Sequence, residues 1–389
     1  MHIVSGRLYG GVETLLVTLA RCRALSAAME PEFALCFDGR LREELAETGA
    51  PVHQLGEVRA RHPVSVMRAR RRLRELLHAR SIDVVVCHLP WTEAVFGMVA
   101  RRAGVPLVFW MHGPANGRGW LERWASLTPP DSAICNSEYT AKSLPMIFPG
   151  IPFDVIYLPV RTTSLDRKSQ DYLKVRMQVR QEFDTPPEAL VITQVSRMER
   201  WKGQLVHLAA LARLREIPGE VPNWIAWFVG GAQNPDEVAY GAELKAAASR
   251  LGIADRVRFV GERPEVAKIL AASDIFCQPN VEPEPFGIAF IEALQAGLPV
   301  VASASGGALE IVDSSCGILV PAGRPEVVAD ALRQLISNSE LRSRLGAAGP
   351  ARARQLTDPT AQMSVLAASL EATSSRRTLA SERRSVGIA

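Results

Sequence analysis

Short apolar runs alternate with segments of helical spacing through most of the chain. In the first part, apolar runs of strand length lie at residues 2–5, 33–37, 83–87, 107–111, 132–135 and 154–156. Between them, apolar residues recur every three or four positions, as on one face of a helix, at residues 13–27, 41–48, 64–79, 92–103, 120–126 and 138–146. Buried strands that alternate with helices are typical of βαβ units, so this pattern predicts an α/β fold with a doubly wound parallel sheet.

A second series of the same kind follows a polar stretch at residues 161–187, which we interpret as a linker and a surface helix at 171–183. Its strands are predicted at residues 190–195, 225–229, 257–260, 275–277, 300–302 and 317–320, and only helical spacing follows, at 325–337, 340–348 and 358–372. We therefore predict two tandem Rossmann-like domains, residues 1–160 and 161–357, with a ligand cleft between them. A helix at 358–373 and a disordered, Ser- and Arg-rich tail at 374–389 would complete the chain.

The stretch 274–301 has the order strand, loop, helix, strand. Three prolines exclude a helix from residues 279–285, and helical spacing then runs over 286–296 until Gly297 ends it. In a doubly wound sheet, such a loop and helix start lie at the carboxyl end of the strands, where ligands bind. This stretch is therefore our first candidate for a binding site.

Two carboxylates, Glu284 and Glu292, bracket that loop and helix. They stand eight positions apart, which is roughly 12 Å along a helix axis. Glycosidases hold their two carboxyls closer, at about 5 to 9.5 Å, so hydrolysis between the pair is disfavoured. The spacing fits one extended ligand, held by Glu284 at a sugar and by Glu292 at a ribose. The N–H groups of Phe286, Gly287 and Ile288 would face a diphosphate between them, although a solvated amphipathic helix is the simpler alternative.

Cationic side chains follow the first strand of the second domain. Arg197 and Lys202 lie in a strand-to-helix loop, where a guanidinium and an ammonium can hold a diphosphate. If the diphosphate is a leaving group, the same charges stabilise the transition state. A solvated basic loop is the alternative.

Several polar or glycine turns end other predicted strands. His112 follows the strand 107–111 and is a candidate at the rim of the cleft, with His88 as a second one, although a lone histidine is more often structural. Ser137 is equally well explained as a helix N-cap. The adjacent glycines Gly10 and Gly11 let the backbone approach a ligand after the first strand. For Asn136, Ser137 and Gly230, contact with a ligand is what the family resemblance given next implies.

These motifs together resemble those of one family. The segment Glu284-Pro-Phe-Gly-Ile-x-x-x-Glu292 resembles the E-x7-E motif of retaining glycosyltransferases of the GT-B fold, family four. Other matches are the R-x4-KG pattern at 197–203, the GG-x-E turn at 10–13 and the GG-x-x-E turn at 306–310. The resemblance covers about residues 1–350; it is strong over 191–320 and thin in the first domain. It implies a GT-B fold in which the helix at 358–372 crosses back to the first domain.

The resemblance also implies an activity. A sugar of hexose type would pass, with retention, from a nucleotide-diphosphate sugar to a hydroxyl of a glycan, a lipid-linked acceptor or a small molecule. Catalytic roles would fall to His112, Glu284, Arg197 and Lys202, and Glu282 could share the sugar with Glu284. A 2-epimerase on this fold and a non-catalytic partner subunit are the alternatives, and the intact cationic and acidic positions argue against the subunit.

Composition narrows the remaining possibilities. No Asp-x-Asp pair is present, and Arg197 and Lys202 would take the place of a metal, so we expect no metal and no cofactor besides the donor substrate. The glycines do not form the G-x-G-x-x-G fingerprint of dinucleotide-binding enzymes, and nothing resembles a nucleic-acid module. Six scattered cysteines without a CxxC pair, no apolar run of about 18 residues and a strand that begins at residue 2 predict a cytoplasmic protein without a signal peptide.

Charge is unevenly distributed. The net charge is only +4, but arginines crowd the predicted helix that contains residues 68–80. A solvated helix face is one interpretation. The other is peripheral contact with an anionic membrane at its inner face, or with an acidic acceptor.

Overall fold

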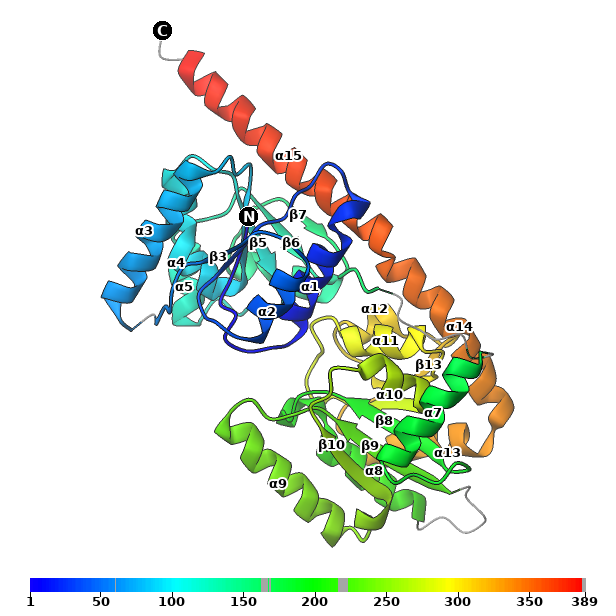
Figure 1. Cartoon of the computed structure of the whole chain (residues 1–389). Coiled ribbons are helices and arrows are strands. Elements are labelled where there is room, and N and C mark those ends of the chain that lie inside the picture. Colours follow the sequence, from blue (N-terminus) through cyan, green and yellow to red (C-terminus); the bar gives the residue numbers. More distant parts are fainter. Residues whose placement is uncertain (60, 162–166, 168, 216–222, 387–389) are drawn as a thin grey trace. The chain divides into compact units, whose positions relative to one another are not determined.

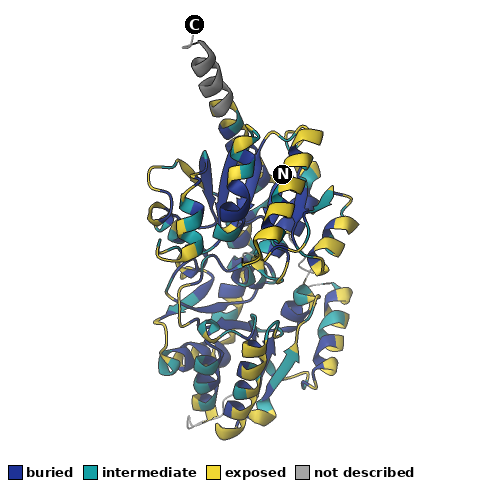
Figure 2. Ribbon diagram, turned by 90° about the vertical axis from the view of Figure 1, so that its left-hand side faces the viewer, coloured by how far each residue is buried: buried dark blue, intermediate teal, exposed yellow. Residues whose placement is uncertain are grey.

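The computed structural model describes residues 1–59, 61–161, 167, 169–215 and 223–386, with side chains described as far as residue 376. The chain forms two compact units, Met1–Arg161 with Thr357–Ala389, and Thr162–Leu356 (Figure 1). In each unit a buried sheet is covered by helices whose outer faces are exposed (Figure 2). The prediction of two doubly wound parallel sheets is confirmed.

The first unit contains a seven-stranded parallel sheet in the order β3-β2-β1-β4-β5-β6-β7. Its strands are β1 (His2–Val4), β2 (Phe33–Leu35), β3 (Val52–Gln54), β4 (Val85–His88), β5 (Leu107–Met111), β6 (Ser132–Cys135) and β7 (Phe153–Val155). Strand β3 has no counterpart among the strands predicted from the sequence. Its three residues, of which only Val52 is apolar, are partly exposed at the sheet edge, so no apolar run marks the strand.

Helices cover both faces of this sheet. Their bounds are α1 (Gly11–Cys22), α2 (Arg40–Glu47), α3 (Pro63–Ala79), α4 (Leu89–Arg102), α5 (Trp120–Ser126), α6 (Glu138–Ala141) and α15 (Pro359–Val386), with short 3₁₀ turns at Arg23–Leu25 and Leu144–Met146. On one face α4 packs against α3, α5 and strands β4 and β5, while α1 packs against α2 and α15. The apolar stripe of α3, which includes Val66, Leu73 and Leu77, is buried as its spacing predicts.

The C-terminal helix α15 belongs to the first unit. Thr373 bonds the hydroxyl of Ser132 on β6 at 2.7 Å, and the hydroxyl of Ser369 donates to Asp154 on β7 at 2.6 Å. The helix continues to Val386, through most of the stretch from residue 374 that the sequence analysis predicts to be disordered. The backbone of residues 374–386 is helical here, whereas the composition alone predicts a disordered tail.

The second unit contains a six-stranded parallel sheet in the order β10-β9-β8-β11-β12-β13. Its strands are β8 (Leu190–Val195), β9 (Trp224–Val229), β10 (Val257–Gly261), β11 (Ile275–Gln278), β12 (Val300–Ser303) and β13 (Gly317–Val320). Strand β9 is completely buried, with Trp224 and Trp227 among the largest core side chains. The strand order reverses direction between β8 and β11, which is where ligands bind in doubly wound folds.

Helices again cover both faces. They are α7 (Gln170–Glu182), α8 (Gln204–Arg215), α9 (Pro235–Arg250), α10 (Val266–Ala272), α11 (Ile288–Gln295), α12 (Ala308–Ile311), α13 (Pro325–Ser337) and α14 (Ser339–Thr357), with 3₁₀ turns at Arg200–Lys202 and Ala254–Arg256. Helix α8 packs against α9 and α13, and α10 packs against α7 and α11. Helix α11 begins at Ile288, not at residue 286 as the spacing predicts, because Gly287 has the left-handed φ of 106° and caps the helix.

Candidate functional site

Loops at the carboxyl edge of the second sheet fit against one another through glycines. Gly203 has a φ of +73°, and a Cβ there would lie 1.9 Å from the carbonyl oxygen of Pro279, after β11. Gly306, with a φ of +62°, would place a Cβ 2.3 Å from the carbonyl oxygen of Glu284. Only glycine permits both the left-handed backbone and this close approach. The loops after β8, β11 and β12 are thereby fixed beside one another.

This fit brings Lys202 and Glu284 together. The Nζ of Lys202 lies 3.1 and 2.8 Å from the two carboxylate oxygens of Glu284, and both side chains are mostly buried. Asn280 and Gln278 donate to the same carboxylate at 2.7 and 3.3 Å. The ammonium also lies 3.8 Å from the centre of the Trp201 ring, a cation–π contact. A buried charge pair with this number of hydrogen bonds is held in one geometry.

Arg197 is held by a different acidic cluster. Its guanidinium pairs with Glu237 of α9 and lies 3.5 Å from Glu199. The side-chain amide of Gln204 donates to the backbone oxygen of Arg197 at 2.8 Å. Within the described residues, no hydrogen bond or ion pair joins Arg197 to the Lys202–Glu284 pair. Glu237 is not among the predicted site residues, because in the sequence it is an ordinary acidic residue in the first turn of a helix.

The predicted glycine turn at Gly230 supports this loop from the next strand. Gly230 has a φ of +141°, and a Cβ would lie 1.9 Å from the carbonyl oxygen of Ser196. The backbone N–H of Met198 donates to the oxygen of Gly231 at 3.3 Å. Gly230 therefore fixes the loop that carries Arg197. This is a structural role, whereas the sequence predicts that Gly230 contacts a ligand.

Glu292 lies on α11, half buried. Burial disfavours the carboxylate and raises the pKa of Glu292 to about 7. Across the part of the chain that the structure describes, its side chain has no hydrogen-bond partner. A carboxyl in this state is available to accept bonds from a ligand.

The residues between the two acids differ in what they can contact. Phe286 is buried in the core, so its side chain packs and its predicted contribution is limited to the backbone. Gly287 lies against the Phe290 ring, where a Cβ would approach to 2.4 Å. Ile288 is the first residue of α11, so its N–H is among those that a helix start leaves unpaired. Glu282, the alternative to Glu284, is exposed.

In the first unit, His112 lies directly after β5 and is buried. Burial lowers its pKa to about 3, so the ring is neutral at physiological pH. Its Nε2 lies 2.8 Å from Nδ1 of His88, and Asn136 donates from Nδ2 to its backbone oxygen at 3.2 Å. The structure thus brings together the predicted residues His112 and Asn136, and it adds His88 as a direct partner.

The other predicted turn residues of this unit have local structural contacts. The hydroxyl of Ser137 accepts from the N–H of Thr140 at 3.1 Å, the N-cap alternative stated above. Gly10 donates its N–H to the Glu13 carboxylate at 2.9 Å, and Gly11 is the first residue of α1. These contacts leave the predicted ligand roles of Gly10, Gly11 and Ser137 as predictions.

Two further observations concern the chain as described. No group of three or more His, Cys, Asp or Glu side chains that could hold a metal ion occurs among the described residues. None of the helices in the described ranges is both long enough and apolar enough to cross a membrane.

Two family models together match most of the chain. Residues 175–352 match the family model described as "Glycosyl transferases group 1", and residues 9–164 match "Glycosyltransferase Family 4". A D-inositol 3-phosphate glycosyltransferase of Actinosynnema mirum is 30% identical over 315 residues, which are 74% of this chain and 72% of that protein. A phosphatidyl-myo-inositol mannosyltransferase of Mycobacterium leprae is 38% identical over 121 residues, 30% of this chain and 32% of that protein.

A solved structure is similar over nearly the whole chain. Anabaena Alr3699/HepE, in complex with UDP and glucose, superposes with a TM-score of 0.80 at 24% sequence identity, covering 95% of this chain and 98% of that one. At this level of identity the similarity concerns the fold. The predicted GT-B architecture, with two Rossmann-like units, is confirmed.

Proposed function

This chain belongs to the glycosyltransferases of group 1, family four, and from that membership we propose that it transfers a hexose-type sugar from a nucleotide-diphosphate sugar to a hydroxyl acceptor, with retention and without a metal. The acceptor would be a glycan, a lipid-linked molecule or a small molecule.

The observation that carries this proposal is the buried Lys202–Glu284 pair at the carboxyl edge of the second sheet. A diphosphate that binds beside Lys202 would give the Lys202 ammonium a second anionic partner. Glu284 could then accept hydrogen bonds from hydroxyls of the sugar. Lys202 would stabilise the charge that grows on the departing phosphate. The pair would thus keep the site neutral until the donor binds.

The neighbouring residues extend the donor site. Glu292 would accept the ribose hydroxyls, and the N–H of Ile288 at the start of α11 would face the diphosphate. Arg197 would join Lys202 on the phosphates, which requires that the donor compete with Glu237 for the guanidinium. Same-face attack assisted by the departing phosphate is the mechanism that the family membership supports.

The first unit would supply the acceptor side. His112 has one ring nitrogen, Nδ1, that is not bonded to His88, and in the neutral ring this nitrogen can either donate to or accept from a sugar hydroxyl.

The relatives suggest where a donor screen should begin. The solved HepE complex holds UDP and glucose, and one relative is named for mannosyl transfer. We therefore propose uridine and guanosine diphosphate hexoses as the first donors to test. The named inositol-containing acceptors of the relatives make phosphorylated or lipid-linked polyols the first acceptors.

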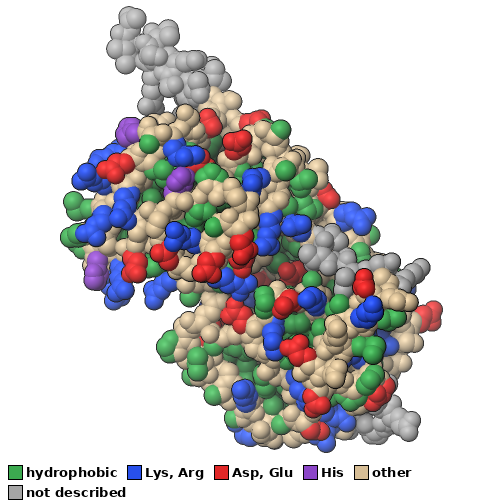
Figure 3. Space-filling view, in the orientation of Figure 1, with side chains coloured by type: hydrophobic (Ala, Val, Ile, Leu, Met, Phe, Trp, Pro, Cys, Tyr) green, Lys and Arg blue, Asp and Glu red, His purple; other side chains and the backbone are tan. Residues whose placement is uncertain are grey.

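The basic helix α3 supports a further part of the proposal. Lys and Arg side chains gather over the edge of the first unit where α3 lies (Figure 3). Among the described residues, exposed Arg61, Arg68 and Arg74 have no acidic partner, whereas Arg71 pairs with Glu75 at 2.7 Å. Unpaired arginines beside exposed Met67 suit peripheral contact with an anionic membrane from the cytoplasm.

The decisive experiment measures nucleotide diphosphate release from UDP- and GDP-hexoses, with and without candidate acceptors and with a chelator present. We expect one donor to be consumed and its nucleotide to raise the melting temperature by mass action. The anomeric configuration of the product, read by NMR, tests retention. If the nucleotide stabilises the protein while no donor is ever cleaved, the chain is a binding subunit and the proposal fails.

A further inference from the structure

Three buried histidines form a continuous hydrogen-bonded chain across the first sheet. Nδ1 of His2 lies 3.0 Å from Nε2 of His88, and Nδ1 of His88 lies 2.8 Å from Nε2 of His112. The residues come from three neighbouring elements, since His2 begins β1, His88 ends β4 and His112 follows β5. We call this set the histidine chain.

The two hydrogen bonds couple the tautomers of all three rings. A neutral imidazole has one N–H and one acceptor nitrogen, so each bond needs a donor on one side and an acceptor on the other. If His112 is protonated at Nδ1, then His88 and His2 must also carry their protons at Nδ1. If His112 is protonated at Nε2, both others must be protonated at Nε2. A mixed arrangement would place two donors or two acceptors against each other in a buried site.

The surroundings keep the rings neutral and in place. His2, His88 and His112 are 2, 0 and 8% exposed, and burial lowers the pKa of each one. The His88 and His112 rings stack with a centroid distance of 5.1 Å, and the Trp110 ring lies against both. A charged ring is therefore costly, so protons must move along the three rings in one concerted shift that leaves each ring neutral.

The backbone at His88 is strained. Leu89, the next residue, has a φ of 71°, which is unusual for a residue that is not glycine or asparagine. The Thr92 hydroxyl donates to the backbone oxygen of His88 and holds this turn. Strain of this kind costs on the order of 1–3 kcal/mol and is concentrated at functional sites.

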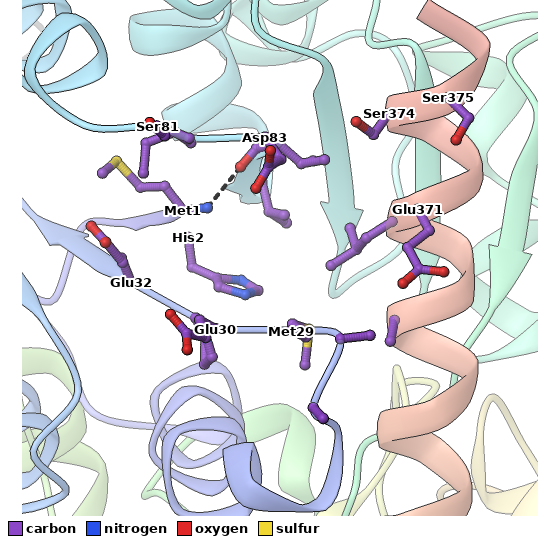
Figure 4. Close-up of a pocket in the computed structure, with 18 residues that line it drawn as sticks. Met1, His2, Met29, Glu30, Glu32, Ser81, Asp83, Glu371, Ser374 and Ser375 are labelled. Atoms are coloured by element: carbon purple, nitrogen blue, oxygen red, sulfur yellow. Dashed lines mark hydrogen bonds between the residues drawn. The ribbon is translucent and has the colours of Figure 1, made fainter. Parts of the chain in front are cut away.

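The two ends of the histidine chain have different surroundings. The His2 ring points into a pocket of about 620 Å³ (Figure 4), which is lined by residues of β1, the segment before β2, the segment before β4 and α15. The carboxyl groups of Glu30, Asp83 and Glu371 line the same pocket and are exposed, so protons can exchange there with solvent. At the other end lies His112. Within the described ranges, neither Nε2 of His2 nor Nδ1 of His112 has a hydrogen-bond partner.

We infer that His2 and His88 are positioning residues that set the tautomer of His112 and exchange its proton with the pocket beside His2. This inference rests on the proposed function only for what His112 contacts. In the Nδ1–H arrangement His112 offers a donor to a sugar hydroxyl, and in the Nε2–H arrangement it offers an acceptor.

The switch between these arrangements is balanced. One proton enters at Nε2 of His2 from the pocket, and the Nδ1 proton of His2 passes to Nε2 of His88. The Nδ1 proton of His88 passes to Nε2 of His112, whose own Nδ1 proton leaves to a bound hydroxyl oxygen or water. Each ring gains and loses one proton and ends neutral, and the reverse shift is balanced in the same way.

The first test is the tautomer itself, which needs no substrate. In protein labelled with ¹⁵N-histidine, ring-nitrogen shifts separate protonated from unprotonated nitrogens, and we expect all three rings to share one tautomer. His2→Phe removes the far end of the chain without touching a hydrogen bond of His112. We expect His112 to become a mixture of both tautomers in this variant. An unchanged His112 tautomer in His2→Phe would overturn the inference.

The second test uses a conservative variant and activity. His2→Asn retains an amide that can replace Nδ1–H, so it should restore a single His112 tautomer. With the donor identified, kcat of His2→Phe should fall about 10- to 100-fold at unchanged KM, and His2→Asn should recover part of the loss.

Phe33→Leu is the control for packing. It alters the contact with the His2 ring, whose centroid lies 5.5 Å from that of Phe33, without removing a nitrogen. An equal kcat loss in Phe33→Leu would show packing as the cause and overturn the inference. A protein without any transferase activity would refute the proposed function but leave the tautomer result standing.

Discussion

Lys202 and Glu284 are the residues on which the proposed donor site depends most. Each neutralises the other in a mostly buried position, and Asn280 and Gln278 complete the shell of the carboxylate. Removing one partner of a buried pair leaves an uncompensated charge, so a single substitution alters both stability and chemistry. The two effects can be separated by a second substitution.

Lys202→Ala should lower kcat/KM. The expected loss of transition-state stabilisation is roughly 2–4 kcal/mol, because the leaving group loses a positioned cation. It should also lower the free energy of unfolding, since Glu284 stays buried without its cation. Adding Glu284→Gln removes that charge, and we expect the double variant to recover stability but no activity. Urea unfolding and steady-state kinetics measure both quantities; recovered turnover in the double variant would show that Lys202 has a structural role alone.

Glu292 should titrate when the donor binds. Its pKa of about 7 in the free protein means that roughly half of the molecules carry the proton at pH 7. Ribose hydroxyls that donate to the carboxylate favour the charged form and lower the pKa, so nucleotide binding should release protons near pH 7. Calorimetric titration in two buffers of different ionisation enthalpy measures that release. Glu292→Gln should show none; an equal release in this variant would assign the proton elsewhere.

The same shift has a consequence for stability, with a defined sign. The folded pKa lies above the value of an unfolded Glu, so this group stabilises the fold at pH values below about 4.5. Its contribution is lost as the pH rises towards 7, because the unfolded chain releases the proton first. Glu292→Gln should remove this part of the pH dependence in unfolding experiments.

At the scale of elements, glycines determine how closely the loops of the proposed donor site approach one another. Gly306 and Gly323 offer a matched comparison. Both have left-handed φ values, +62° and +70°, but a Cβ at Gly323 would meet nothing within 4 Å. Backbone strain is therefore common to both positions, and the contact with Glu284 is specific to Gly306.

Gly306→Ala should lose activity and stability together. Both alanine variants carry a strain of about 1 kcal/mol, and Gly306→Ala should cost about 1–3 kcal/mol more because Glu284 must move. We expect donor affinity to fall in Gly306→Ala and to stay unchanged in Gly323→Ala. Thermal unfolding and nucleotide titration of the two variants provide the measurement, and equal donor affinities would contradict the fit described for this loop.

Helix α3 should determine membrane contact if that part of the proposal holds. Each unpaired arginine near an anionic surface contributes about 1 kcal/mol, so replacing three by glutamine should weaken binding to phosphatidylserine vesicles about 100-fold. Co-sedimentation with vesicles measures the change. The triple variant carries Arg61→Gln, Arg68→Gln and Arg74→Gln, and its control changes the exposed arginines Arg213, Arg250 and Arg344 of the second unit. An equal loss in the control would indicate a net-charge effect.

Continuous apolar runs made most strands predictable, since buried parallel strands need apolar residues on both faces. The edge strand β3 is partly exposed, so it contains no apolar run that would predict it. Motif spacing indicated Lys202 and Glu284 as candidate site residues, but it could not predict that they pair. Lys202 and Glu284 stand 82 positions apart, and periodicity says nothing about which loops become neighbours. The histidine chain was missed for the same reason, because the order β1-β4-β5 brings its members together.

At the scale of the whole molecule, α15 completes a unit that begins with the first strand. Its buried stripe includes Met363, Leu366 and Ala367, and it packs against α1 and the following 3₁₀ turn. The first unit is therefore built from both ends of the chain, while the second is one continuous segment.

Leu366→Ala should destabilise the first unit selectively. The side chain is 1% exposed, and removing a buried leucine costs about 2–5 kcal/mol. Hydrogen exchange measured by mass spectrometry should show lost protection in β1 and β6 but not in β8 and β9. Val365→Ala, at a position 47% exposed on the same helix, is the control and should change little. Uniform loss across both units would contradict the division described here.

The position of α15 also constrains how the protein is made. A ribosome produces the seven strands of the first sheet early, yet the helix that packs against α1 is translated only after the entire second unit. The surface of the first unit that α15 covers therefore stays exposed to solvent while the second unit emerges and folds. A transcript that ends before the codon for residue 357 would yield the second unit joined to a first unit that lacks this cover.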